Sequence, residues 1–516
     1  MRVKLACILI LTFVLMGVAH GKPDIEDALQ GHSLLEQWRV DEADALAQSL
    51  LQYYPESGDA HFLKARVLFF KGQYDAAGKT LKQLSDNQPR VKEFKSLVEQ
   101  TRKATSGFVS RETEHFIFRF TKGPDEILVH YAEEVLERSW HVLGGLLDYF
   151  PKEKVLVEFY PDKEPFSHIS PLTMQDIMVS GTVALCKYHR IMMISPASLV
   201  RGYNWMDTLS HEFTHFLLSK KSNNNVPLWL NEGIAKNFET RWRGDMSPLE
   251  PVMENILAQG LTNDYLIPLE SMMPSLARLK TAEDVQLAYA QVATMVDYMV
   301  SLKGEKVLSL MLVDMAAEVP FEQILEKHIG KNLKTFQEDW KTHMKQKQLK
   351  TIPGLKVMNV RFKPDRQTDG EEKAYTEIEN KSIQNLTFLG DVLKDRSHTK
   401  AAIIEYQKAI KESSSLSPIL HNKLAVTYLM VKEYGQAEPL LKESLKYYPS
   451  FHTTLSNLGE LYYATGKYKQ AGEYFETAVR LNPFNPFVHQ RLIEIDQKLE
   501  KRKAAEVQGQ LYKLLE

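Results

Sequence analysis

The segment "LSHEFTHFLLSKKSNNNVPLWLNEG" (residues 209–233) decides how this chain of 516 residues is interpreted. Its first apolar residues recur with the period of one helix face: Leu209, Phe213, Phe216 and Leu217. His211 and His215 are four residues apart and therefore project from one side of that helix, where two imidazoles can hold one metal ion. Glu212 lies between them and is offset enough to act on a water molecule instead of binding the metal.

The rest of the segment supplies a third ligand. Residues 220–227, "KKSNNNVP", are a run of turn formers, and a second helical pattern follows at 228–238. This second helix can fold back beside the first, which places Glu232 to offer a carboxylate oxygen. Two histidines and one glutamate leave a fourth position open, as in catalytic zinc sites. The segment therefore predicts a Zn²⁺ site made of His211, His215 and Glu232, with Glu212 as the general base.

These residues resemble the signature of the gluzincin metallopeptidases. That signature is HExxH followed by a helix bearing NExxA, which stands here as His211-Glu212-x-x-His215 and Asn231-Glu232-Gly233-Ile234-Ala235. More narrowly, residues 110–345 are similar to the bacterial peptidase MA proteins that are fused to tetratricopeptide repeats. The resemblance implies an α+β, zincin-like peptidase domain that hydrolyses peptide bonds of a protein or peptide substrate with Zn²⁺ as its cofactor.

The resemblance also raises questions about supporting residues. Lys236 stands where thermolysin-like enzymes carry an aspartate that orients a zinc-binding histidine. Asp207 and Glu239 are candidates to replace it, although we favour an exposed helix-surface charge for each. Tyr289 is similar to the tyrosine that donates to the oxyanion in gluzincins, and its alternative is a core aromatic residue. His189 is interpreted as a turn residue, with metal proximity as the alternative.

The surrounding sequence predicts a small mixed sheet. In residues 115–120 and 155–160 apolar residues alternate with others as in strands, and in 126–147 they have the spacing of a helix. Residues 180–195 are predicted to form a hairpin. Helical patterns return from 291 to 344. We assign residues 105–350 to the peptidase domain. In gluzincins the strand before the motif pairs with an extended substrate, so the resemblance makes 180–195 the candidate substrate edge. Cys186 lies there and is interpreted as a buried small hydrophobic residue.

Two regions repeat themselves. Between residues 381 and 516, small, aromatic and proline positions recur after 34 or 35 residues, a pattern that resembles the tetratricopeptide repeat. Residues 22–104 repeat more weakly: Ala43 and Pro55 precede Ala77 and Pro89 by 34 positions. We predict a solenoid at 381–516, a linker at 351–380, and a helical region at 22–104 that is either repeat-like or a plain bundle. A concave repeat surface predicts a protein partner.

The first 21 residues predict export. Arg2 and Lys4 precede an apolar run from Leu5 to Val18, and small residues follow, as in a signal peptide. The run is shorter than the ~20 residues of a spanning helix, and no second apolar stretch of that length follows. We therefore expect a periplasmic or extracellular protein with no stable membrane span after cleavage. Lys and Arg number 64 against 66 Asp and Glu, which argues against a nucleic-acid partner.

Three function classes remain open at this point. The first is an exported zinc metallopeptidase whose repeats recruit proteins. The second is a catalytically inactive scaffold of the cell envelope, and the third is a metallohydrolase that acts on substrates other than peptides. Because His211, Glu212, His215 and Glu232 are all present, we favour the first.

Overall fold

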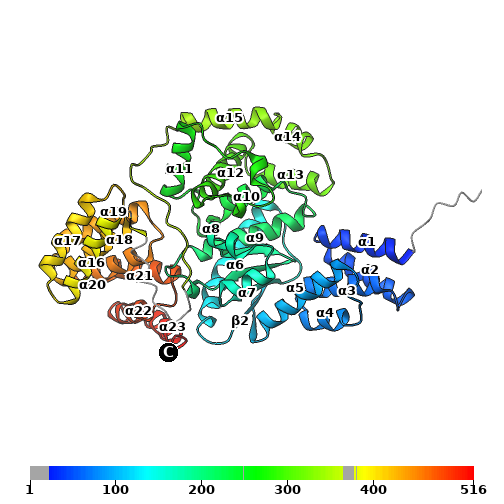
Figure 1. Cartoon of the computed structure of the whole chain (residues 1–516), viewed down its shortest axis with the longest axis horizontal. Coiled ribbons are helices and arrows are strands. Elements are labelled where there is room, and N and C mark those ends of the chain that lie inside the picture. The colour runs from blue at the N-terminus through cyan, green and yellow to red at the C-terminus, as the bar shows by residue number, and fades with distance from the viewer. Residues whose placement is uncertain (1–22, 248, 364–376, 379) are drawn as a thin grey trace, which may run out of the picture.

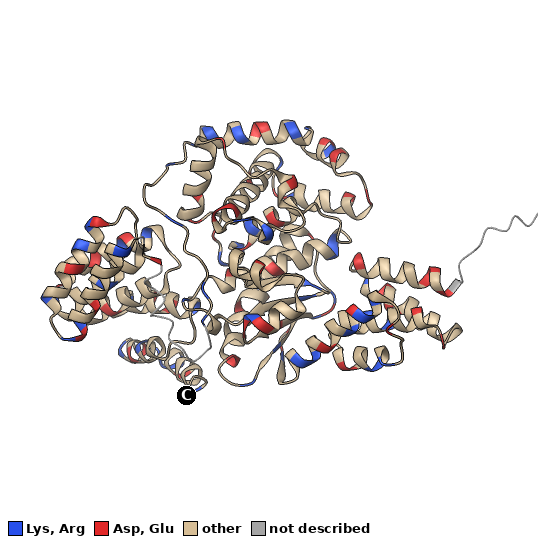
Figure 2. Ribbon diagram, in the orientation of Figure 1, with Lys and Arg blue, Asp and Glu red and all other residues tan. Residues whose placement is uncertain are grey.

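The computed structural model describes residues 23–247, 249–363, 377–378 and 380–516. A central domain of helices and strands is flanked on opposite sides by an N-terminal and a C-terminal helical region (Figure 1). The predicted signal peptide (1–21) lies outside the described residues. So do residues 364–376 and 379 of the predicted linker (351–380). Basic and acidic residues are interspersed along the helices of all three regions (Figure 2).

The central domain contains one five-stranded sheet with the order β1-β2-β3-β5-β4. Its strands are β1 (Phe108–Glu112), β2 (Phe116–Thr121), β3 (Val155–Tyr160), β4 (Ala184–Lys187) and β5 (Arg190–Ile194). Strands β2, β3 and β5 are parallel, whereas β1 and β4 are antiparallel to their neighbours and form the two edges. The predicted strands and the hairpin are confirmed. The sequence reasoning missed β1, whose residues are mostly exposed and do not alternate in burial.

Helices cover this sheet and position the motif. The helix predicted between β2 and β3 is α6 (Glu126–Leu147), and the motif helix is α9 (Trp205–Lys221). The apolar face of α9 is fully buried, and the Phe213 ring meets the Phe116 ring of β2 edge to face at 5.3 Å. The second predicted helix is α10 (Leu228–Phe238), which packs against α9 and against α12 (Ala282–Lys303). The motif helix is thus held between the sheet and α10.

The remaining helices of the central domain complete its core. They are α7 (Lys163–Ile169), α8 (Met174–Ser180), α11 (Pro251–Thr262), α13 (Lys306–Ala316), α14 (Phe321–Ile329) and α15 (Leu333–Gln346). The helical pattern predicted for residues 291–344 corresponds to α12 through α15. In the part of the chain that the structure describes, no helix combines the length and the apolar character needed to span a bilayer.

The N-terminal region consists of five helices. They are α1 (Pro23–Glu36), α2 (Val40–Tyr53), α3 (Gly58–Phe70), α4 (Tyr74–Leu81) and α5 (Pro89–Thr105). Small residues that the repeat pattern singled out, Ala43 and Ala77, are fully buried and let neighbouring helices approach closely. Trp38 and Gly72, 34 positions apart, both take left-handed backbone conformations where one helix of a pair turns into the next. The backbone therefore repeats here as the sequence pattern suggested.

The C-terminal region is an array of four helix pairs. They are α16 (Lys381–Asp395) with α17 (Thr399–Glu412), α18 (Pro418–Met430) with α19 (Tyr434–Tyr447), α20 (His452–Ala464) with α21 (Tyr468–Leu481), and α22 (Pro486–Lys498) with α23 (Arg502–Lys513). A Cβ at Gly459 would lie 2.8 Å from the Phe475 ring, so this pair requires the small residue that the repeat pattern supplies. The region is a helical solenoid.

Candidate metal centre

The structure brings the three predicted metal ligands together. His211 and His215 lie on α9 with their Nε2 atoms 3.1 Å apart. Glu232 on α10 places Oε2 3.6 Å from His211 Nε2 and 3.5 Å from His215 Nε2. Among the described residues, these three form the group of potential ligands whose donor atoms all lie within 4.8 Å of one another.

The donor set fits a zinc ion. Two ligand atoms about 2.1 Å from a tetrahedral ion are separated by about 3.4 Å, close to the three separations observed here. Glu232 Oε2 is buried and has no hydrogen-bond partner in the described structure. Because an unpaired buried carboxylate oxygen is costly, its position is better explained by a cation between the three side chains.

The outer nitrogen of each histidine is also engaged. His211 Nδ1 lies 3.2 Å from Glu239 Oε2, and His215 Nδ1 lies 2.8 Å from Asn231 Oδ1. Carboxylate and amide oxygens accept hydrogen bonds, so each Nδ1 donates a proton to its partner and each Nε2 is the nitrogen left to bind a metal. Sequence reasoning missed the role of Asn231, although that residue belongs to the motif and directly precedes Glu232.

The expectation that Asp207 and Glu239 are exposed surface charges is wrong. The Glu239 side chain is only 15% exposed and orients His211. Asp207 is 5% exposed, but it accepts hydrogen bonds from Trp242 and Arg243 and does not contact a predicted ligand. Of the two candidates, Glu239 therefore replaces the aspartate found in thermolysin-like enzymes.

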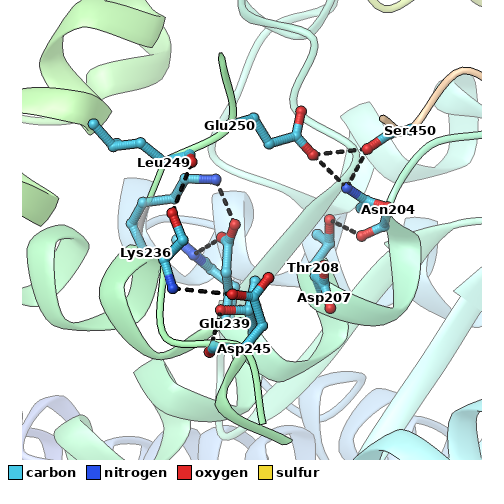
Figure 3. A network of polar contacts seen from close by, with 12 residues as sticks. Asn204, Asp207, Thr208, Lys236, Glu239, Asp245, Leu249, Glu250 and Ser450 are labelled. Carbon is cyan, nitrogen blue, oxygen red and sulfur yellow. Dashed lines mark hydrogen bonds and ion pairs between the residues drawn. The ribbon is translucent and has the colours of Figure 1, made fainter. Parts of the chain in front are cut away.

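Lys236 supports Glu239 directly. The two side chains form an ion pair one helical turn apart, as Figure 3 shows. Burial lowers the pKa of Lys236, but the neighbouring Glu239 carboxylate outweighs that effect and raises it. In the same way, burial raises the pKa of Glu239, and Lys236 together with His211 holds it below its usual value. The residue that departs from the family pattern thus helps keep the orienting carboxylate charged.

Burial and the neighbouring charges also shift the pKa values of His211, Glu232 and Glu212. Burial lowers the pKa of His211, but the nearby carboxylates of Glu232 and Glu239 outweigh that effect and raise the pKa to about 10. Burial raises the pKa of Glu232, yet the two histidines hold it well below its usual range. The pKa of Glu212 is raised, mainly by burial, which brings this carboxylate closer to the range in which a general base exchanges protons near neutral pH.

Tyr289 lies at the site. It projects from α12, and its ring centroid is 6.1 Å from that of His211. Burial raises its pKa well above the usual value, and the Glu232 carboxylate adds to this. Tyr289 lines the same cavity as Glu212, which distinguishes it from an aromatic residue enclosed in the core.

His189 and Cys186 occupy the hairpin before the motif. His189 is in the turn between β4 and β5, where its ring packs against Trp38 and Phe216 and its Nε2 lies 3.3 Å from Glu153. It does not belong to the ligand group, so it is a turn histidine as favoured from the sequence. Cys186 is a free, half-buried thiol on β4 that also lines the cavity.

The cavity that contains the site has a volume of about 330 Å³. The site side is formed by His211, Glu212, His215, Glu232 and Tyr289. Residues of the N-terminal helical region form a second wall of the cavity: Leu35, Glu36, Trp38, Arg66 and Phe70. Sequence reasoning gave no sign of this wall, because it depends on how two distant parts of the chain pack together.

Comparison with known families agrees with this architecture. Residues 168–346 match the Peptidase MA superfamily, and residues 34–101 and 453–485 match tetratricopeptide repeats. The chain therefore contains a Peptidase MA superfamily domain, at residues 168–346, together with tetratricopeptide repeats. The match at 34–101 favours repeats over a plain bundle in the N-terminal region. No curated protein matches the chain.

Several solved structures are similar to part of the chain. MamA from Desulfovibrio magneticus is 21% identical over 29% of this chain and 87% of its own length, with a TM-score of 0.25. PilF from Pseudomonas aeruginosa is 27% identical over 27% of this chain and 64% of its own length, also with a TM-score of 0.25. The Sgt2 tetratricopeptide repeat domain from Aspergillus fumigatus is 20% identical over 24% of this chain and 83% of its own length, with a TM-score of 0.23.

Proposed function

We propose that this chain is an exported, zinc-dependent peptidase of the gluzincin type, with a zincin-like catalytic domain and with repeats that recruit protein partners. One observation carries the proposal. Three donor atoms from α9 and α10 converge, and one of them is the unpaired carboxylate oxygen of Glu232. Glu212 lies in the same cavity, and its own Oε2 is also buried without a hydrogen-bond partner in the described structure. Membership of the Peptidase MA superfamily supports peptide hydrolysis as the reaction class.

His211, His215 and Glu232 would hold the ion, leaving one position open for substrate chemistry. A bound zinc ion supplies Lewis-acid catalysis, which acidifies a water molecule and polarises a carbonyl group. Glu212 accepts the proton of the attacking water and passes it to the departing amine nitrogen. The raised pKa of Glu212 suits both steps, because the same carboxyl must first accept and then release a proton near neutral pH.

Tyr289 is assigned to the developing negative charge on the carbonyl oxygen. Burial raises the pKa of its phenol well above the usual value, so the hydroxyl keeps its proton at neutral pH and can donate a hydrogen bond. Strand β4 forms an edge of the sheet beside the cavity and offers backbone groups to an extended peptide.

The cellular setting of the proposal comes from the sequence. The basic and apolar pattern of residues 1–21 supports export, and the repeats support recruitment of a protein substrate or partner. We place the mature protein in the periplasm or outside the cell.

The test compares the wild-type protein with Glu212→Gln, using metal analysis and a peptide library. We expect about one zinc ion per chain in both proteins, and cleavage by the wild type only. Glu93→Gln serves as the matched control, because Glu93 is exposed on α5 and forms no ion pair in the described structure. Cleavage that persists in Glu212→Gln would refute the assigned base. Zinc binding without any cleavage would favour a scaffold or a different hydrolase, and absence of zinc from both proteins would refute the site.

A further inference from the structure

The second wall of the cavity that contains the metal site comes from outside the matched peptidase region. The family match begins at residue 168, whereas the wall is built by α1, the turn after it, and α3. Any peptide that reaches Glu212 through this cavity must therefore pass side chains of the N-terminal repeats. This arrangement lets the repeats influence which peptides are accepted.

The wall is fixed to the catalytic domain. Glu158 of β3 is fully buried, pairs with Arg190 Nε of β5 at 3.0 Å, and accepts a hydrogen bond from the Tyr74 hydroxyl of α4 at 2.7 Å. Nearer to the motif, Asn224 Nδ2 donates to the Glu36 carbonyl oxygen at 2.9 Å. The Glu158–Arg190 ion pair lies within the sheet, and the Tyr74 hydroxyl links the N-terminal repeats to it. Loss of a donor to a buried carboxylate is costly, so this contact holds the repeats against the cavity.

The N-terminal repeats also hold the turn between β4 and β5. Tyr188 and His189 form its two central residues with φ angles of 54° and 64°, a conformation that non-glycine residues rarely adopt. The Phe69 ring lies 5.4 Å from the Tyr188 ring, and the Trp38 ring lies 5.6 Å from the His189 ring. Packing against the repeats stabilises a strained turn and thereby fixes the direction of the strand that leads into it.

Lys187 is the last residue of that strand and lines the cavity. It is half-buried, and its Nζ lies 5.4 Å from the centroid of the Tyr188 ring. Within the described part of the chain, no carboxylate lies within 4.0 Å of this ammonium group. Arg66 differs, because its guanidinium pairs with Glu36 at 2.5 Å. Within the described residues, the wall and the turn carry two cations and one carboxylate, and Lys187 is the cation that forms no ion pair.

A partly desolvated cation without a carboxylate partner is suited to bind an anionic group of a ligand. Burial lowers the pKa of Lys187, which agrees with its incomplete solvation. An amine in this position gains most from a ligand that brings its own negative charge. Peptides carry such a charge as a carboxylate, either on an aspartate or glutamate side chain or at the chain terminus.

We propose that Lys187, held in place by the N-terminal repeats, selects peptides that carry a carboxylate close to the bond cleaved at Glu212. This inference deepens the proposed peptidase function and rests on it. The N-terminal repeats then act as a substrate-selecting wall of the catalytic cavity, in addition to any role in recruitment.

The test measures binding separately from cleavage. Fluorescent peptides that differ only by Glu or Gln at one position, scanned along the peptide, are titrated into zinc-loaded Glu212→Gln protein with and without Lys187→Met. A second set differs only by a free or an amidated C-terminus. We expect at least about tenfold tighter binding of the carboxylate peptide in one set, with the preference lost in Lys187→Met and kept in Lys187→Arg. Lys122→Met is the matched control, because Lys122 is exposed and does not line the cavity.

Each outcome decides the inference. If tighter binding of the carboxylate peptide is found only in the set that differs by Glu or Gln, Lys187 binds an acidic side chain. If it is found only in the set that differs at the C-terminus, Lys187 binds the terminal carboxylate. Equal binding within both sets, or a preference that survives in Lys187→Met, overturns the inference. If the otherwise wild-type protein cleaves peptides without any such preference, the peptidase function is supported and the inference about Lys187 is overturned. A preference in binding with no cleavage of any peptide would support the subsite and count against the peptidase. Zinc content and thermal unfolding show whether each variant is folded.

Discussion

Substitutions in the Lys236–Glu239 ion pair can separate two effects. One is the loss of support for His211 as a metal ligand, and the other is the loss of unfolding free energy. Lys236 lies on α10 and Glu239 caps the C-terminus of that helix, with 17% and 15% of their side chains exposed. Glu239→Gln keeps the shape of the side chain but removes the charge that Lys236 neutralises. It also weakens the acceptor that orients His211 through Nδ1.

The expected magnitudes differ between the two properties. Loss of one partner of a fully buried pair costs about 3–5 kcal/mol, and the partial exposure of this pair reduces our expectation to about 2–3 kcal/mol of unfolding free energy for Glu239→Gln. Loss of an outer-shell partner lowers metal affinity about 10–100-fold. In Lys236→Met/Glu239→Gln no cation is left unpaired, so the stability cost falls to about 1 kcal/mol while the loss of zinc affinity remains.

The assay pairs urea unfolding of the metal-free proteins with zinc competition against a chromophoric chelator. Asp207→Asn is the matched control: Asp207 is a buried carboxylate one turn before His211 that binds Arg243 and Trp242 instead of a ligand. It should lower stability and leave zinc affinity unchanged. Unchanged zinc affinity in Glu239→Gln, or a double variant as unstable as the sum of the two single variants, would refute the reasoning.

Three further predictions concern other parts of the site. Because the folded pKa of His211 is raised from 6.5 to about 10, its charge stabilises the metal-free protein fully below pH 6.5, and that contribution is lost as pH rises towards 10. Zinc must displace this proton, so calorimetry at pH 7.5 in two buffers should show proton release, and zinc affinity should rise up to about pH 10. Tyr289→Phe should lower kcat about 10²–10³-fold with unchanged zinc content in steady-state kinetics, and an unchanged kcat would remove Tyr289 from the mechanism. Gly233→Ala places a Cβ 2.6 Å from the Val292 carbonyl oxygen of α12 and should cost about 1–3 kcal/mol in urea unfolding, whereas a neutral effect would show that α10 can shift.

The metal ligands could be predicted because local rules place them. Helical periodicity alone brings His211 and His215 to one side of α9, and a turn-rich segment of fixed length returns Glu232 to the same point. Neither step depends on distant parts of the chain. The same reasoning reached Tyr289 only through family resemblance, because the path of α12 across the site is a tertiary feature.

Burial of charges could not be predicted in this way. Nothing in the sequence distinguishes Asp207 and Glu239 from exposed charges, and inside the fold Arg243 and Lys236 neutralise them. A charged side chain looks the same in sequence whether its partner is water or a buried cation. The contribution of Arg66 and Phe70 to the cavity was hidden for a related reason, since it arises from the docking of one region on another.

The repeats show how the backbone can be more regular than the sequence. In the C-terminal array, left-handed residues recur at Ser397, Lys432, Gly466 and Glu500, spaced by 35, 34 and 34 positions. Only Gly466 has the residue type that favours this conformation, so the sequence marks one turn of four. Packing of each helix pair imposes the same turn on the other three residues, at a local cost that the packing offsets.

Both repeat regions are attached near the ends of the helix that carries the two candidate metal-binding histidines. Before α9, Asn204 Nδ2 donates to Ser450 Oγ of the C-terminal array at 2.6 Å, and at its first residue Trp205 Nε1 donates to the Arg480 carbonyl oxygen at 2.7 Å. After α9, Asn224 holds the N-terminal region through Glu36. A protein recruited by the C-terminal repeats, as proposed, would therefore be held in a fixed position relative to the catalytic helix. Recruitment at one end of α9 and selection at the other would then both be positioned relative to the same catalytic helix.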